Sequence, residues 1–143
     1  MKTAVIQLLT AFLSSLGFSM VFGVRRRFLF LAALGGLLAW GVYLIADLWR
    51  GHEFISCLLA SSFAVVYAEV LARRLKSPAT IFVVPAILPL VPGGTLYYAM
   101  SSAVHGDIAG AKSFGAQTLT IALAIASGIS LVMALRELQM KRQ

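Results

Sequence analysis

Thirty consecutive residues, 77–106, contain no Lys, Arg, Asp or Glu, yet prolines and glycines interrupt the middle of this apolar stretch. A straight helix of this length would be about 45 Å long, whereas the hydrocarbon core of a bilayer is roughly 30 Å thick. Each proline removes a backbone donor and clashes with the preceding turn, so one regular helix is excluded. A broken membrane helix is typical of a binding site or a solute pathway. The interrupting residues are Pro85, Pro89, Pro92, Gly93 and Gly94.

The composition places the whole chain in a membrane. Of the 143 residues, 60% are hydrophobic and 12% are charged, whereas globular proteins are about half apolar and about a quarter charged. The sequence therefore predicts an all-α integral membrane protein that forms one transmembrane domain over residues 1–143. Five transmembrane helices are expected, at approximately 3–24, 28–48, 54–72, 79–104 (broken near 92–94) and 114–135. Little chain remains for a soluble domain.

The distribution of basic residues predicts the orientation in the membrane. The formal net charge is +7, and most of the basic residues would fall on one side of a chain that crosses five times. The positive-inside rule then places the N-terminus outside and the C-terminus in the cytoplasm. The charge is thus explained by topology, and nucleic acid is not an expected partner. The basic residues on the cytoplasmic side are Arg25, Arg26, Arg27, Arg73, Arg74, Lys76, Arg136, Lys141 and Arg142.

Catalytic and metal-binding patterns are weak. Cys57 is the only cysteine, which excludes an internal disulfide and a multi-cysteine metal site. His105 and Asp107 lie two residues apart without other ligands nearby, so a loop is favoured over a metal site. No triad-like or phosphate-binding pattern is present. We therefore expect no enzyme activity, no metal and no cofactor.

Small residues recur at four-residue spacing in several predicted helices, which predicts close helix packing. The first helix also contains Ser15 and Ser19 on one face. Their hydroxyls would bond the backbone of their own or a neighbouring helix, or else form a polar stripe along a conduit, and the sequence leaves both open. The small-residue stripes are Ala32 with Gly36, Gly35 with Ala39, Ala60-Ala64-Ala68-Ala72, and Ala122-Ala126-Ser130 beside Ala124 and Gly128.

Two acidic residues, Asp47 and Glu69, belong to predicted membrane helices, in which a charge is expensive, but both lie toward the helix ends, where an ion pair can reach the headgroups. Glu69 precedes Arg73 by four residues and Asp47 precedes Arg50 by three, so each is expected to form an ion pair near the headgroups. The alternative is a proton-coupling carboxylate. Glu69, about one turn inside its basic flank, is the better candidate for that role.

The segment after the break has the features of an anion-binding helix terminus. A half-helix over 95–103 would begin with amides that lack intrahelical partners and carry the positive end of the helix dipole. Such a terminus suits a carboxylate. The alternative is a kinked packing helix or a re-entrant loop without a ligand. The candidate pathway residues are Pro89, Pro92, Gly93, Gly94, Thr95, Tyr97, Tyr98 and Ser101.

These residues resemble a known family. Segment 78–82, Pro-Ala-Thr-Ile-Phe, and segment 85–100, Pro-Ala-Ile-Leu-Pro-Leu-Val-Pro-Gly-Gly-Thr-Leu-Tyr-Tyr-Ala-Met, resemble the signature of the threonine/serine exporter family. The similarity is to its small, separately encoded subunit of the YjjB type, and 18–24, Phe-Ser-Met-Val-Phe-Gly-Val, is similar to that subunit's first helix. Gly93-Gly94 departs from relatives in which a bulkier or hydroxylated residue follows the first glycine.

The resemblance implies a protein of the bacterial inner membrane that works with a larger YjjP-type partner subunit. It also implies export of threonine and serine, as in fused members, or of succinate, as in the split pair. The favoured function is thus a subunit of a secondary exporter for small carboxylates or amino acids. The alternatives are a scaffold that transports nothing itself and a homo-oligomeric channel. Substrate, coupling ion and stoichiometry do not follow from the sequence.

Overall fold

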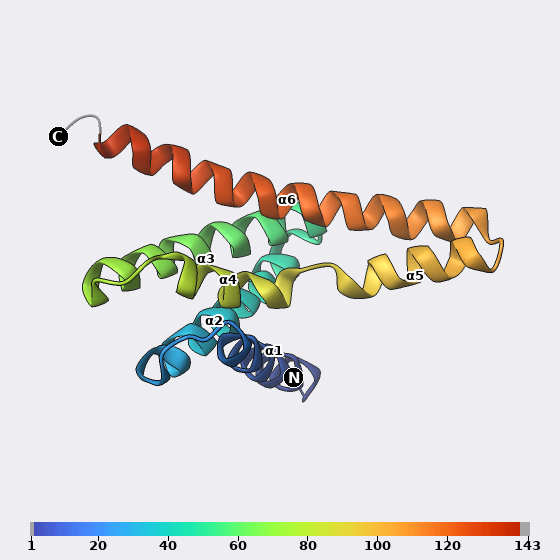
Figure 1. The fold of residues 1–143 in the computed structure, drawn as a ribbon. Coiled ribbons are helices and arrows are strands. Elements are labelled where there is room, and N and C mark those ends of the chain that lie inside the picture. Colours follow the sequence, from blue (N-terminus) through green and yellow to red (C-terminus); the bar gives the residue numbers. More distant parts are fainter. Residues whose placement is uncertain (1, 141–143) are drawn as a thin grey trace.

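The computed structural model describes residues 2–140, which form helices joined by short turns (Figure 1). Within these residues, four helices are long and apolar enough to cross a membrane, and a fifth span arises if one bent pair is counted as a single crossing. The expected all-helical membrane fold is confirmed, and the segment expected as a broken fourth span is this bent pair. The elements are α1 Lys2–Val21, α2 Arg26–Arg50, α3 Glu53–Leu75, α4 Thr80–Ile87, the 3₁₀ turn η1 Leu88–Leu90, α5 Gly93–Val104 and α6 Ile108–Met140.

Helix α2 is the centre of the fold, because it packs against α1, α3 and α4. Small residues make this packing close: Ala32, Ala39, Ala60 and Ala64 are completely buried. Without a hydrophobic drive between helices in lipid, such small residues let the backbones approach and gain dispersion contacts. The predicted packing faces of the second and third helices are therefore confirmed. We call α1–α4 together with η1 the core bundle.

The packing face of α6 differs from the expected one. Ala122, Ala126 and Ser130 are exposed, whereas Ala124 and Gly128 are buried against α3. A β-carbon on Gly128 would lie 2.7 Å from the Leu58 carbonyl oxygen, so the backbones of α3 and α6 are nearly in contact there. The sequence contained two stripes of small residues on this helix. Only the stripe with Ala124 and Gly128, which has a glycine where the two helices cross, permits this close approach of α3 and α6.

The predicted break lies where Pro92 interrupts the chain. The segment Thr80–Leu90 and helix α5 are bent by 49° relative to one another. Pro92 has φ −78° and ψ 56°, and the Gly93 amide donates to the Val91 carbonyl over 2.8 Å, which is an inverse γ-turn. Gly93 and Gly94 were expected in the unwound turn but form the first turn of α5. The proline supplies the irregular backbone by itself, so the glycines can be helical.

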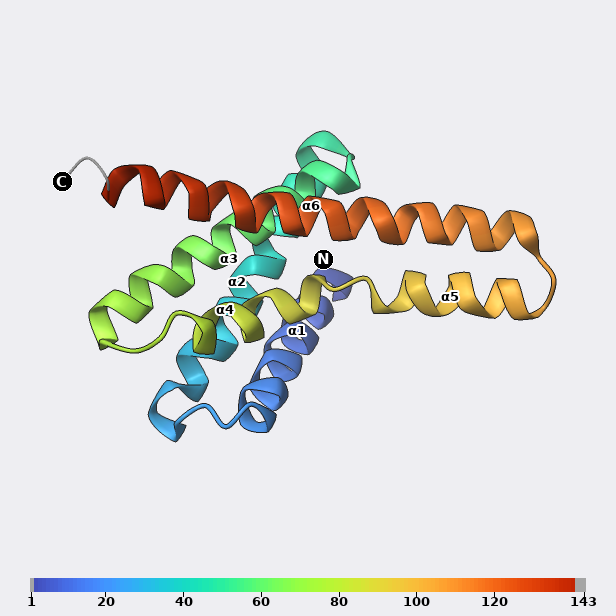
Figure 2. The same cartoon turned by 45° about the horizontal axis from the view of Figure 1, so that its top comes forward.

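Helix α5 packs against α6 and against no other element to a comparable extent. No residue of α5 is buried. Figures 1 and 2 show α5 and the first half of α6 running side by side beyond the core bundle, as an antiparallel pair. We call residues 93–120 the α5–α6 hairpin. Helix α6, with 33 residues, is about 50 Å long, and its second half lies along α3.

Helix α6 begins at Ile108, six residues before the expected start at 114. The Asp107 carboxylate accepts a hydrogen bond from the Gly110 amide at 2.9 Å, which caps the helix. Lys112 is exposed on the first turns, so its charge does not interrupt the helix. The uncharged run in the sequence therefore marks only the apolar part of a longer helix.

The basic segments gather at one end of the core bundle. The α1–α2 turn and the α3–α4 turn line one pocket together, and Arg73 and Arg136 line another. In Figures 1 and 2 both turns and the C-terminal end of α6 lie on the side opposite to the tip of the α5–α6 hairpin. We call this the basic end. Lys141 and Arg142 lie outside the described residues.

Candidate functional site

The candidate pathway residues are divided between the core bundle and the α5–α6 hairpin. Pro89, on η1, lines a pocket of about 200 Å³ together with polar residues of α1 and with Trp40 of α2. Pro92, Gly93 and Gly94 lie at the start of α5, and the space beside both glycines is open. Tyr97 and Tyr98 follow on the hairpin, and they are 67% and 55% exposed. Ser101, near the end of α5, is half-buried.

The pocket at Pro89 combines an apolar wall with several polar groups. Gln7, Thr10 and Ser14 line it from α1. Trp40 adds an indole Nε1 that is buried without a hydrogen-bond partner among the described residues. A buried donor without a partner is costly and marks a place where a ligand acceptor would be stabilised. The sequence analysis missed Trp40, because only the fold places it opposite Pro89.

The N-terminus of α5 has no side-chain cap. The Thr95 hydroxyl donates to the Pro92 carbonyl at 3.2 Å. The Thr118 hydroxyl of α6 in turn donates to the Thr95 hydroxyl oxygen at 2.9 Å. Tyr98 contacts the ring of Phe114, with the ring centroids 5.5 Å apart. Two of the predicted hydroxyl residues therefore also join α5 to α6. Their partners on α6 are 23 and 16 residues further along the chain, and nothing local in the sequence indicates them.

Ser15 and Ser19 bond backbone groups. The Ser15 hydroxyl donates to the Pro85 carbonyl at 2.9 Å, and the Ser19 hydroxyl donates to the Ser15 carbonyl at 2.6 Å. Both serines are completely buried. Of the two possibilities left open by the sequence, backbone bonding is confirmed for both residues. Ser15 thereby ties α1 to the half-helix that contains Pro85.

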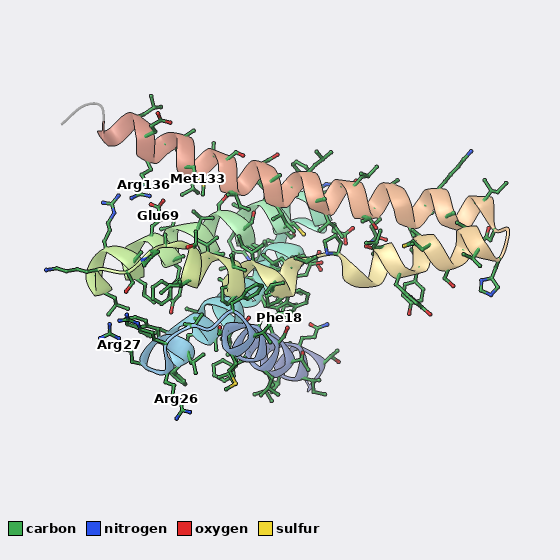
Figure 3. The ribbon with its side chains drawn as sticks, viewed as in Figure 1. Phe18, Arg26, Arg27, Glu69, Met133 and Arg136 are labelled. Atoms are coloured by element: carbon green, nitrogen blue, oxygen red, sulfur yellow. The ribbon has the colours of Figure 1, made fainter. Side chains whose placement is uncertain are left out.

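Glu69 does not pair with Arg73 as expected. Its carboxylate accepts from Arg136 of α6, with the Nη1–Oε1 distance at 2.9 Å, and Figure 3 shows the two side chains pointing toward one another. Helix α6 packs along α3 and brings this guanidinium closer than the neighbour on the same helix. The Asp47–Arg50 pair lies outside the described residues, because the Arg50 side chain is not among them.

The residues considered for metal binding have other partners. His105 Nδ1 lies 2.8 Å from the Ser101 carbonyl oxygen, and Asp107 caps α6. Within the described part of the chain, no three His, Cys, Asp or Glu side chains are grouped as a metal site would require. Glu53 instead accepts two hydrogen bonds from the Gln117 amide, at 3.1 and 3.0 Å, which links α3 to α6.

The comparison with protein families gives a match over most of the chain. The model of the family described as "Threonine/Serine exporter, ThrE" matches residues 7–135, which contain all of α2 to α5 and most of α1 and α6. The comparisons with curated proteins and with solved structures found no match. The family is one of transporters rather than enzymes, and its multi-pass membrane character agrees with the apolar spans. The chain belongs to the threonine/serine exporter family.

Proposed function

We propose that this chain is a membrane subunit of a secondary exporter for amino acids such as threonine and serine, or for similarly small carboxylates. The observation that carries the proposal is the bend at Pro92. The segment Thr80–Leu90 has eight α-helical and three 3₁₀ residues, about 18 Å in length, which is somewhat more than half of the hydrocarbon thickness. A crossing that bends there presents irregular backbone at mid-depth, where transporters hold their solutes.

The pocket at Pro89 supports this location. Its polar groups come from α1 and α2, and Pro89 belongs to the segment that bends. A solute carboxylate there would accept from the Trp40 indole and from side-chain amide or hydroxyl groups of Gln7 and Ser14. The uncapped start of α5 offers further amides two to three residues beyond Pro92. Export would then consist of opening this region alternately to the two sides.

The basic end supports the orientation that we propose for the chain in a bacterial inner membrane. Its arginines and Lys76 would face the cytoplasm, and the tip of the α5–α6 hairpin would face the outside. The pocket at Pro89 would then lie between the two faces. A solute leaving the cytoplasm would reach it from the basic end.

A larger partner subunit or a second copy would cover the α5–α6 hairpin. Helix α5 packs against α6 and against no other helix of this chain to a comparable extent, so this chain alone encloses no path there, and the exposed apolar side chains would face lipid or another subunit. The exposed residues are Leu96, Tyr97, Tyr98, Met100, Val104, Ile108 and Leu119. The same observation favours a second candidate function, in which the chain only assembles or orients the partner.

Efflux from vesicles tests the proposal. Three kinds of vesicle are prepared: with this chain alone, with the larger membrane protein of its genomic neighbourhood alone, and with both. Each kind of vesicle is loaded with threonine, serine or succinate. We expect efflux above the background of loaded, protein-free vesicles only when both proteins are present. Equal efflux with the neighbour alone would reduce this chain to an assembly subunit. Background efflux in every combination would contradict the proposed function.

A further inference from the structure

A second pocket lies between α3 and α6 at the basic end. It has a volume of about 350 Å³ and contains three charged side chains, Glu69, Arg73 and Arg136, among valines and a leucine of the same two helices. It is separate from the pocket at Pro89, which is formed by α1, α2 and η1.

The charged groups of this pocket retain unused hydrogen-bonding capacity. Arg136 donates to Glu69 through Nη1 at 2.9 Å, while its Nε is buried and has no hydrogen-bond partner among the described residues. A guanidinium has five donors in a planar fork that matches a carboxylate with two parallel bonds. Leaving a buried donor of a charged group without an acceptor is costly. The Arg136 side chain is 38% exposed and bonds Glu69 through Nη1 alone, so its accessible donors can hold a second carboxylate besides that of Glu69.

Arg73 adds a second guanidinium to the same pocket. It lies on α3, one turn beyond Glu69, and it is exposed. The side chain of Glu69 is 12% exposed and uses one oxygen, Oε1, for Arg136. The other oxygen remains an acceptor for a cationic group. The pocket thus presents two positive charges and one negative charge in an open groove flanked by aliphatic side chains.

We propose that this pocket is the loading site for a zwitterionic amino acid at the cytoplasmic end. The carboxylate of the amino acid would bind Arg136 and Arg73, and its ammonium group would bind Glu69. The aliphatic walls leave room for a short side chain. This inference rests on the proposed function and narrows it to amino acids, because the second carboxylate of a dicarboxylate such as succinate would face Glu69.

The binding experiment uses the intact chain in phosphatidylcholine nanodiscs and compares four solutes. They are L-threonine, 3-hydroxybutyrate (which lacks the ammonium group), 1-amino-2-propanol (which lacks the carboxylate), and succinate. We expect threonine to bind at least about tenfold more tightly than each of the other three. Succinate or 3-hydroxybutyrate binding as tightly as threonine would overturn the proposal.

Variants separate the two halves of the site. Glu69→Gln is expected to bring the affinity ratio of threonine to 3-hydroxybutyrate close to one, because threonine loses its ammonium contact, whereas the loss of the Glu69–Arg136 ion pair affects both solutes alike. Arg136→Gln is expected to do the same for the ratio of threonine to 1-amino-2-propanol. Arg73→Gln leaves the Glu69–Arg136 ion pair intact and is expected to weaken the binding of threonine severalfold. Arg74→Gln is the matched control, since Arg74 is exposed and outside the pocket; its affinities are expected to stay unchanged.

Lipid binding is the competing explanation and is measured in the same series. If phosphatidylethanolamine, added to the nanodiscs, saturates the pocket and threonine does not bind, the site is a lipid site and the proposal is wrong. Unchanged threonine affinity in both Arg73→Gln and Arg136→Gln would also overturn it. If the wild-type protein supports vesicle efflux but the variants keep the wild-type affinity ratios, the loading site is refuted and the exporter function stands. The expected ratios without efflux would refute the function instead.

Discussion

Ser15 and Pro85 form a buried hydrogen bond between α1 and α4, in which the serine hydroxyl donates to the proline carbonyl at 2.9 Å. Both side chains are completely buried. The proline ring removes its own amide from the helix and disturbs the preceding turn, so the short half-helix α4 is weakened from within. The hydroxyl of the neighbouring helix holds the carbonyl of that same proline. This contact fixes the segment that leads to the bend.

Removing this hydroxyl should destabilise the core bundle. In Ser15→Ala the Pro85 carbonyl loses its hydrogen-bond donor on α1, and hydrogen bonds between membrane helices contribute roughly 0.6–2 kcal/mol. We expect a loss of this size in the free energy of unfolding, measured by titration with a denaturing detergent. Ser130→Ala makes the same chemical change on an exposed face and should have no effect. Equal stability of both variants would contradict the role of this hydrogen bond.

The close approach beside this hydrogen bond gives a second prediction. A β-carbon on Gly36 would contact the Ser15 hydroxyl and would lie 2.7 Å from the Ser15 β-carbon and 3.3 Å from the Pro85 carbonyl oxygen. Gly36→Ala should therefore destabilise the bundle by about 1–3 kcal/mol through overpacking. Gly17→Ala, where the space is open, should be neutral or slightly stabilising. The same detergent titration compares the two variants. If Gly36→Ala is as stable as Gly17→Ala, the close approach at Gly36 is contradicted.

The contact between α3 and α6 is tested in the same way. Gly128→Ala would place its β-carbon 2.7 Å from the Leu58 carbonyl oxygen, a backbone atom that cannot move away alone. We expect a loss of about 1–3 kcal/mol and separation of the two helices. Gly115→Ala lies on the same helix with open space around it and serves as the control. Similar unfolding midpoints for the two variants would mean that α6 is packed more loosely than described.

The two threonines of the α5–α6 hairpin should be coupled. The hydroxyls of Thr95 and Thr118 are 2.9 Å apart and connect the two helices. A double-mutant cycle with Thr95→Val and Thr118→Val is expected to give a coupling free energy of roughly 0.5–1.5 kcal/mol. Thr120 bonds only the carbonyl of Ala116 on its own helix, so the cycle of Thr95→Val with Thr120→Val should give no coupling. Coupling in the control cycle would show that valine perturbs the hairpin generally.

The orientation is testable by chemical labelling. A thiol from Ser77→Cys, at the basic end, should react with a membrane-impermeant maleimide only from the cytoplasmic side. A thiol from Gly106→Cys, at the hairpin tip, should react only from the outside. The native Cys57 is buried and gives a low background. Labelling of both positions from one side would contradict the five-crossing topology.

The sequence predicted features that arise from local chemistry. Pro92 places the break because a proline lacks the amide a helix needs, whatever surrounds it. The small residues of α2 and α3 predicted close packing for a similarly local reason. The partner of Glu69 could not be predicted, because Arg136 is 67 residues away and competes with a neighbour on the same helix. The buried face of α6 likewise depends on where α3 crosses it.

We propose that transport depends on the bend at Pro92, and variants without the prolines test this dependence. Pro89→Ala with Pro92→Ala restores two amide donors and should allow a straighter helix from η1 into α5. Vesicle efflux of threonine, measured for this double variant beside Gly17→Ala, separates loss of the bend from a general effect of added side-chain volume, because the space beside Gly17 is open and Gly17 lies outside the pocket at Pro89. We predict that efflux falls at least about tenfold in the double variant and stays near the wild-type rate in Gly17→Ala. Wild-type efflux from correctly inserted double variant would contradict the account.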